Sequence, residues 1–306
     1  MSCLLLSSRW RRQIAAARTA AALLAASLTA AGLAGCGLLP AAPRVTDSVS
    51  QALADFGAVP LVLIGEQHDA DAHQQAHAQA VDLLAQAGRL AALALEMADA
   101  PQHTAALPRD ADEARVRAAL RWDDAGWPWR RYGPVVMAAV RAGVPVHGAN
   151  LPRADLRAAM GDLSLDKRLA AAALDIQRSA VRDGHCGLLP ESQIAPMTRM
   201  QVARDQRMAQ TVAALLRQAS AGQTVLLLAG TGHVRRDVGV PQLLRSEASA
   251  AVAARVLWLT ASAPGTLPAP AAPALDRHDR IVRTPPLPAR DYCAELRDSL
   301  RPRNQN

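Results

Sequence analysis

Short, almost wholly apolar runs that alternate with helical patterns constrain this chain more than any other feature. The clearest runs are VPLVLIGE at residues 59–66, LAALALEM at 90–97 and TVLLLAG at 224–230. Runs this short and this apolar are typical of strands buried on both faces, and helices between such strands favour parallel pairing. The chain is therefore expected to adopt an α/β fold, with a mostly parallel central sheet flanked by helices.

The rest of the chain adds further elements to this fold. A helix is expected over residues 69–88, where apolar residues recur at helical spacing and Gly88 suits the end. Helical patterns dominate from about 101 to 216. They exceed what crossovers between strands need, so they predict an inserted helical subdomain within one domain at 51–298. Further strands are expected within residues 144–153, 254–260 and 279–285, the last at an edge of the sheet.

The N-terminal segment has the layout of a bacterial export signal. A basic stretch, SSRWRRQ, precedes an uncharged Ala/Leu-rich stretch over residues 19–33, which is shorter than the roughly 20 residues of a membrane span. LAGC at 33–36 resembles a lipobox. Residues 1–35 are therefore expected to be a lipoprotein signal peptide, Cys36 the lipidated first residue and 36–50 a linker.

These export features predict that the protein lies in the bacterial cell envelope. The lipid would tether it to a membrane, with the folded part facing the periplasm or the cell exterior. An ordinary signal peptide or an uncleaved anchor is the alternative. The only other cysteines beyond residue 36 are Cys186 and Cys293. An oxidising compartment favours a disulfide between them, and two separate buried thiols are the alternative.

The net charge of +7 comes largely from the export signal. Of the 34 basic residues, four arginines lie before residue 19, which leaves 30 against 27 acidic residues. No basic run with interleaved aromatic residues appears either. The charge pattern therefore gives no indication of a nucleic-acid partner.

Polar, ligand-capable residues follow the apolar runs. Glu66 and His68 follow the first run, Glu96 ends the second and His233 follows the third. Ligands of parallel sheets bind beyond the carboxyl ends of the strands, so these four side chains are expected to meet there, with Asn150 beside them. Two carboxylates and two imidazoles suit a divalent metal such as zinc, or acid–base catalysis. Hydrogen bonds or salt bridges that close the strand ends are the structural alternative.

Two further groups of residues have open interpretations. His73 and His77 share a helical face without the glutamate of an HExxH motif, and a solvated face is favoured for His77. GWPWRRYGP at 126–134 collects Trp127, Trp129 and Tyr132 in a chain that is only 3% aromatic. These aromatic side chains either seat the helical subdomain or line an apolar ligand site, where a phenolate could ligate haem iron.

Seven motifs in order resemble one known family. They are LIGEQHD, LALEM, GWPWRRYGPV, VPVHGANLPR, GHCGLLP, MQVARDQRMA and LLLAGTGHVRRDVGVP, within residues 59–293. Together they resemble the ChaN-like lipoproteins of the haem-binding uptake/Tiki superfamily, which also contains TraB-type and erythromycin-esterase-like proteins. The resemblance implies an α/β fold with added helices and a role in haem or iron uptake.

The resemblance also implies site residues for two function classes. For haem, tyrosine ligation points to Tyr132 in preference to Tyr292, with His185 as a competitor, and a ligand on an exposed face would allow a haem-dependent homodimer. The shared GxxH, Glu and His pattern maps onto Gly65 and onto Glu66, His68, Glu96 and His233, as in metal-dependent hydrolases. A lipid-anchored protein that binds haem or an iron-containing ligand is the favoured reading. A metal-dependent peptidase or esterase is the alternative, and a scaffold with a relict site is a third.

Overall fold

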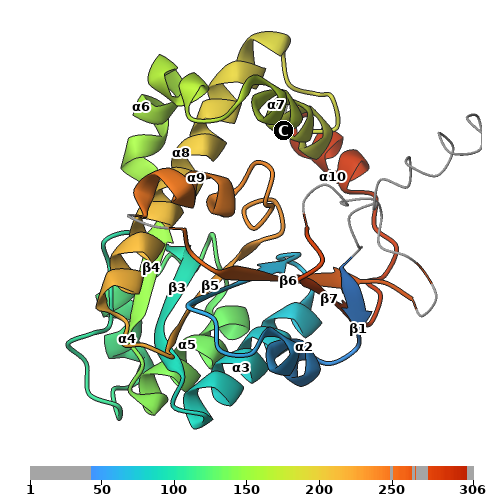
Figure 1. The fold of residues 1–306 in the computed structure, drawn as a ribbon. Helices are drawn as coiled ribbons and strands as arrows, with labels where there is room; N and C mark the ends of the chain where they lie inside the picture. The colour runs from blue at the N-terminus through green and yellow to red at the C-terminus, as the bar shows by residue number, and fades with distance from the viewer. Residues whose placement is uncertain (1–42, 249–250, 264–265, 267–274, 302–306) are drawn as a thin grey trace, which may run out of the picture. The chain divides into compact units, whose positions relative to one another are not determined.

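The computed structural model describes residues 43–248, 251–263, 266 and 275–301. The export signal and Cys36 lie outside the described residues. In the described part, seven strands form one all-parallel sheet in the order β1-β7-β6-β2-β5-β3-β4 (Figure 1). The predicted α/β fold with a parallel sheet is thereby confirmed. The strands are β1 (Arg44–Thr46), β2 (Leu61–Glu66), β3 (Leu90–Asp99), β4 (Val146–Asn150), β5 (Thr224–Gly230), β6 (Ala254–Ala261) and β7 (Arg280–Thr284).

Helices cover both faces of the sheet. One layer contains α2 (Val49–Phe56), α3 (Asp71–Gln86) and α5 (Trp129–Ala142), with α4 (Glu113–Leu120) beside α5. The other contains α8 (Glu191–Gln218) and α9 (Val240–Glu247). The remaining helices are α6 (Leu156–Gly161), α7 (Ala171–Gly184) and α10 (Tyr292–Ser299), with short 3₁₀ turns at Arg153–Asp155 and Leu163–Lys167.

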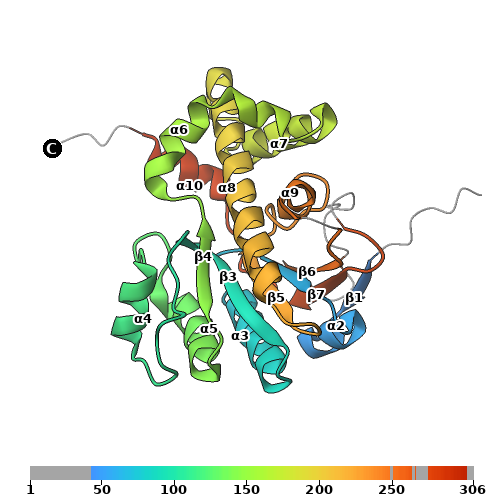
Figure 2. The same cartoon turned by 60° about the vertical axis from the view of Figure 1, so that its left-hand side comes forward.

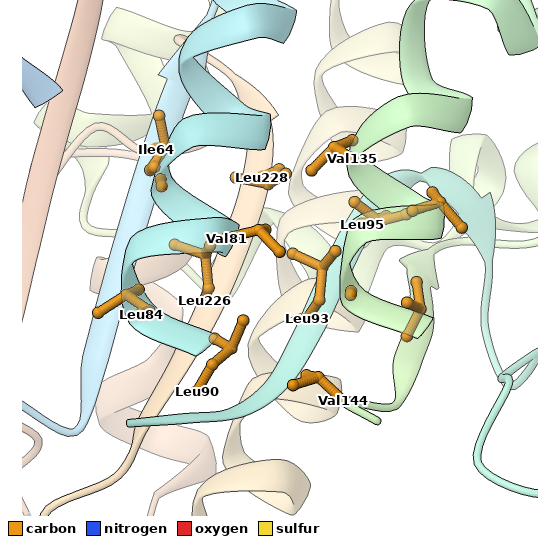
Figure 3. Packing of buried hydrophobic residues seen from close by; sticks show 14 of the residues in the cluster. Ile64, Val81, Leu84, Leu90, Leu93, Leu95, Val135, Val144, Leu226 and Leu228 are labelled. Carbon is orange, nitrogen blue, oxygen red and sulfur yellow. The ribbon is translucent and has the colours of Figure 1, made fainter. Parts of the chain in front are cut away.

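The alternation of side chains along each strand explains why the runs are apolar throughout. Ile64 of β2, and Leu226 and Leu228 of β5, face α3 and α5, where they pack against Val81, Leu84 and Val135 (Figure 3). Their neighbours Leu61, Leu63, Val225 and Leu227 face the opposite way, against α8 and α9. Since both faces of β2 and β5 are covered, every position along them is buried.

The predicted helical stretch consists of two parts separated by β4. The first part, α4 and α5, covers one face of the sheet. In the second, the C-terminal part of α8 packs on the sheet, whereas α6, α7 and the start of α8 extend beyond the ends of the strands (Figure 2). The structure therefore places a helical layer above the carboxyl ends of the strands, where the candidate residues were expected.

Two sequence-based expectations were wrong at the first edge of the sheet. The second half of the linker predicted at 36–50 is structured, since Arg44–Thr46 form β1 and α2 begins at Val49; residues 36–42 lie outside the described ranges. The strand at residues 280–284 was predicted to be an edge strand, but β7 lies between β1 and β6. Both errors have one cause, because a strand of three residues is too short to leave an alternating pattern.

The structure bonds Cys186 to Cys293 rather than leaving two separate thiols. Their Cα atoms are 5.6 Å apart, and the two residues are 107 positions apart in sequence. The disulfide joins the loop after α7 to α10, and α10 appears next to α7 in Figure 1. No residue of α10 is buried. Among the described helices, none is both long and apolar enough to cross a membrane.

Candidate functional site

The four predicted residues meet at the carboxyl ends of β2, β3 and β5. Glu96 lies in the middle: its Oε2 is 3.9 Å from Nε2 of His68, and its Oε1 is 3.3 Å from Nε2 of His233. Glu66 bonds to the other nitrogen of His68, with 2.7 Å between Oε1 and Nδ1. The parallel register of β2 and β5 pairs Glu66 with Gly230, and this pairing brings the residues that follow both strands together.

Two glycines make this close approach possible. A Cβ atom at Gly230 would lie 2.9 Å from Nε2 of His68, and one at Gly65 would lie 2.5 Å from a methyl group of Val234. Both distances are shorter than ordinary carbon contacts. The glycines that end the two apolar runs are therefore needed for packing between the chain segments of the site.

Glu66 is a buried carboxylate that accepts three hydrogen bonds. Its donors are the Tyr132 hydroxyl at 2.6 Å, the Gln74 amide at 2.7 Å and the His68 ring at 2.7 Å. His77 Nδ1 lies 3.4 Å from the carboxylate. Burial raises the pKa of Glu66, but the neighbouring imidazoles and the Tyr132 hydrogen bond outweigh burial and hold the pKa below its usual value. Glu66 is therefore ionised and fixes the orientation of His68.

Glu96 and Asp205 each contact one of the two ring nitrogens of His233. Asp205 Oδ1 lies 2.6 Å from Nδ1 of His233. Burial lowers the pKa of His233, but these two carboxylates overcome burial and raise it to about 10, so the imidazole is protonated at neutral pH. Glu96 also accepts the backbone N–H of Gly230 at 2.7 Å. Burial raises the pKa of Glu96, but His233, His68 and Arg204 outweigh burial and hold it well below its usual value.

Asp205 is a site residue that the sequence analysis missed. It lies on α8 and is completely buried. Its position carried a signal, since Asp205 comes three residues after Val202 and three before Met208, both buried on the same face of the helix. A single carboxylate within an apolar helical stripe requires a buried partner, and His233 is that partner.

His68 is the accessible member of the cluster. Its side chain is 42% exposed, whereas those of Glu66 and Glu96 are buried. The Trp127 ring packs edge-on against it with 4.9 Å between ring centroids. Burial lowers the pKa of His68, but Glu66 and Glu96 more than compensate and raise it above its usual value. An oriented imidazole that reaches solvent suits proton transfer to a bound molecule.

The structure disfavours Tyr132, the predicted haem ligand, in that role. Tyr132 is only 1% exposed and donates its hydrogen bond to Glu66. Burial and the Glu66 charge raise the pKa of the Tyr132 phenol far above its usual value. Trp127 packs on the same ring at 5.8 Å between centroids. The aromatic motif therefore packs beneath the site, and its phenol is not presented to a ligand at the surface.

Tyr292 occupies the accessible position instead. It is 45% exposed, and its hydroxyl donates to Asp69 Oδ2 at 2.6 Å. Gln67 donates to the same hydroxyl at 3.4 Å, and the Arg290 guanidinium lies 5.1 Å from the ring centroid. Gln67 and Asp69 flank His68 in sequence, so Tyr292 lies at the same end of the sheet. The sequence motifs favour Tyr132, so Tyr292 was expected to be the less suitable tyrosine.

His185 lies next to the other half of the disulfide. Its Nδ1 is 2.8 Å from the carbonyl oxygen of Val181. A carbonyl oxygen can only accept, so Nδ1 carries the proton and the lone pair of the neutral imidazole is on Nε2. Because Cys186 is bonded to Cys293, the disulfide ties His185 and Tyr292 to neighbouring parts of the molecule.

The remaining histidines of the motif are part of the scaffold. The expected solvated face at His77 was wrong, because His77 and His73, both on α3, are fully buried. His73 accepts the N–H of Gln67 at 2.9 Å and contacts Thr284 at 3.0 Å. Burial and the neighbouring His77 lower the pKa of His73 to about 4, so it is neutral. The two imidazoles support the loop that carries His68.

The predicted metal site finds no support in the side-chain geometry. Within the described ranges, no three His, Cys, Asp or Glu residues are arranged to hold a metal ion. Both Nδ1 atoms at the centre of the site are taken up by carboxylates, and the protonated His233 has no lone pair to offer. The Arg204 guanidinium, 3.6 Å from Glu96, adds a further positive charge.

Comparisons with known proteins agree with this fold. A family model described as haem-binding uptake, Tiki superfamily, ChaN matches residues 52–244. A solved structure described as cofacial heme binding to ChaN of Campylobacter jejuni is 20% identical, with a TM-score of 0.56 over 72% of this chain and 87% of that one. At this identity the likeness shows a shared fold.

Two further structures are more distant. The type III effector HopBA1 is 15% identical, with a TM-score of 0.45 over 83% of this chain and 100% of that one. A protein from Bacillus cereus is 11% identical, with a TM-score of 0.35 over 72% of both chains. No curated protein matches the chain.

Proposed function

This chain belongs to the family described as haem-binding uptake, Tiki superfamily, ChaN, and from that premise we propose that it binds haem through Tyr292. The observation that carries the choice of ligand is the contrast between the two tyrosines. Tyr132 is buried and bonded to a carboxylate, whereas Tyr292 is 45% exposed. Haem offers an iron with axial positions that accept a phenolate or an imidazole.

The surroundings of Tyr292 suit this role. The phenol must lose its proton to ligate iron, and Asp69 already accepts that proton in a hydrogen bond of 2.6 Å. The Asp69 carboxylate raises the pKa of Tyr292, whereas Arg290 lowers it and lies against the ring, where it would stabilise a phenolate. His185 presents its Nε2 lone pair from the other side of the disulfide and is the second candidate ligand.

A haem titration followed by absorption spectroscopy tests this proposal. The purified protein should give a saturable Soret shift with a defined stoichiometry. Tyr292→Phe should lose the tyrosinate spectrum, whereas the matched variant Tyr132→Phe should keep it. His185→Ala should change the spectrum only if the imidazole is the second ligand. An unchanged spectrum in Tyr292→Phe refutes the ligand assignment, and no saturable shift in the wild-type protein refutes haem binding itself.

We further propose that the protein is a haem-dependent homodimer. A ligand on an exposed helix leaves the second face of a bound haem uncovered. A second copy of the chain would bury that apolar face. Gel filtration with and without haem checks this proposal, and the same elution volume in both states would contradict it.

We propose that Cys36 anchors the protein to the envelope membrane for haem or iron uptake. The motif LAGC and the preceding basic and apolar stretches support this proposal, which concerns residues outside the described ranges. Labelling with radioactive palmitate should mark the wild-type protein and not Cys36→Ala. Growth on haem as the only iron source should then depend on the protein.

A second candidate function is hydrolysis of an ester or a peptide at His68. The observation in its favour is a half-exposed imidazole that Glu66 orients from Nδ1, which is the geometry of an acid–base group. A substrate screen with His68→Gln as the inactive control tests this function. Activity should persist in chelator, because the described residues of this cluster are not arranged to hold a metal ion.

A further inference from the structure

A pocket beside the His68 cluster gathers three arginines from three separate elements. It has a volume of about 290 Å³, and we call it the arginine pocket. Arg121 comes from the end of α4, Arg153 from the 3₁₀ turn after β4 and Arg204 from the middle of α8. The remaining lining residues are Met97, Ala98, Asp99, Asp123, Trp127, Asn150, Leu151 and Leu156.

Two of the three arginines in the arginine pocket are not paired with an acid. Arg204 lies 3.6 Å from Glu96, and the two aspartates of the lining accept backbone N–H groups. Asp99 accepts from Arg153 at 3.4 Å, and Asp123 accepts from Ala125 at 3.2 Å. Within the described residues, the side chains of Arg121 and Arg153 have no acidic partner at salt-bridge distance. Unpaired guanidinium groups at the mouth of a pocket favour an anionic ligand.

Arg204 is held in place for such a ligand. Its Nε donates to Oδ1 of Asn150 at 2.9 Å, and the Asn150 amide in turn donates to the backbone oxygen of Glu96 at 2.9 Å. Only 22% of the Arg204 side chain is exposed. Asn150 is therefore a positioning residue for a largely buried guanidinium. This arrangement lowers the loss of side-chain freedom when an anion binds.

Part of the wall is apolar. Trp127, Met97 and Leu151 line the pocket together with Leu156. An inorganic anion would leave this wall in contact with water, whereas an acid with an apolar body would cover it. A volume near 290 Å³ lies at the lower end of small-molecule sites. The pocket therefore suits a compact ligand.

We propose that the arginine pocket binds a small organic acid. Its acid group pairs with Arg204 and Arg153, and its apolar body lies against Trp127 and Leu151. The site is separate from Tyr292 and does not rest on haem binding. It adjoins the His68 cluster, because Trp127 packs on His68 and Arg204 lies 3.6 Å from Glu96.

Calorimetric titration of the purified protein with benzoate, and with its neutral isostere benzamide, tests the proposal. Benzoate should bind saturably at one site, and benzamide should not bind. Arg153→Gln and Arg204→Gln should each weaken benzoate binding by about tenfold or more, since each removes a charge-assisted contact. Arg217→Gln, an exposed arginine on the same helix as Arg204, should bind benzoate as the wild type does.

Several results would overturn the proposal. They are the absence of saturable benzoate binding, equal binding of benzamide, and unchanged binding in both pocket variants. Arg153 is exposed, so its variant keeps the fold even if Arg204→Gln does not, and circular dichroism checks both. Benzoate binding that persists in the haem-saturated protein supports a separate site. Loss of benzoate binding on haem addition would assign the pocket to haem and refute the separate site.

Discussion

Breaking the Cys186–Cys293 disulfide should destabilise the protein and release α10. This helix buries none of its residues, so few contacts other than the covalent bond hold it. Its remaining links to the body of the protein are polar and exposed, such as the Tyr292 hydroxyl on Asp69 and Arg290 at 3.6 Å from the same carboxylate. Exposed ion pairs contribute about 0–1 kcal/mol, too little to replace the covalent bond.

The size of the effect follows from the length of the closed loop. The disulfide joins residues 107 positions apart, and closing a loop of about 100 residues in the unfolded chain stabilises the native state by about 4.7 kcal/mol. This figure is an upper limit. Without the disulfide, α10 detaches from the native state and gains conformational entropy. This gain offsets part of the entropy that the unfolded chain gains. Urea unfolding should therefore show a lower midpoint for the double variant Cys186→Ser/Cys293→Ser than for the oxidised wild type.

Reductant provides the internal control. The wild type with reductant should match the double variant, and the double variant should not respond to reductant. If Tyr292 ligates haem, both reduced forms should also bind haem more weakly, because the helix that carries the ligand is no longer held. Equal urea midpoints for the oxidised wild type and the double variant would refute the argument that this bond secures α10.

Three further predictions concern the buried site. The pKa of His233 is raised to about 10 by its two carboxylates, so its stabilisation is complete below the unfolded pKa near 6.5 and is lost as the pH rises through about 10. The melting temperature should fall over this range in the wild type but not in His233→Gln. Tyr132→Phe should cost about 1.5–3 kcal/mol in urea unfolding, since it removes a hydrogen bond to the buried Glu66 carboxylate; an unchanged midpoint would contradict that assignment. Gly65→Ala should cost about 1–3 kcal/mol by thermal unfolding, because its Cβ would lie 2.5 Å from Val234. The matched variant Gly161→Ala has open space and should not destabilise the protein.

The sequence was enough to predict the fold and the meeting of Glu66, His68, Glu96 and His233. Apolar runs buried on both faces identify parallel strands locally, and parallel strands bring their carboxyl ends to one edge. The prediction needed no knowledge of which strands are neighbours. It was wrong at β1 and β7, because a strand of three residues carries no periodic signal and the position of an edge depends on pairing between distant segments.

Burial was harder to predict than position along the chain. His77 lies four residues before Val81 and seven before Leu84, so it shares their buried face on α3. A histidine at such a position is usually read as solvated, and the buried Glu66 that it faces belongs to another element. The two tyrosines show the same limit. Tyr132 lies in the stronger motif, but only the packing of Trp127 and the Glu66 hydrogen bond show that it is inaccessible.

The charges of the site favour binding of an anion over binding of a metal ion. Three carboxylates, those of Glu66, Glu96 and Asp205, lie against His68, His233 and Arg204, and both His233 and Arg204 carry a positive charge. A divalent cation bound at Glu96 would have to displace Arg204 and remove the proton from His233, whose pKa is about 10. An organic acid in the arginine pocket needs neither step, since it would pair with the free side of Arg204. The site is therefore better suited to an anion beside Glu96 than to a metal ion upon it.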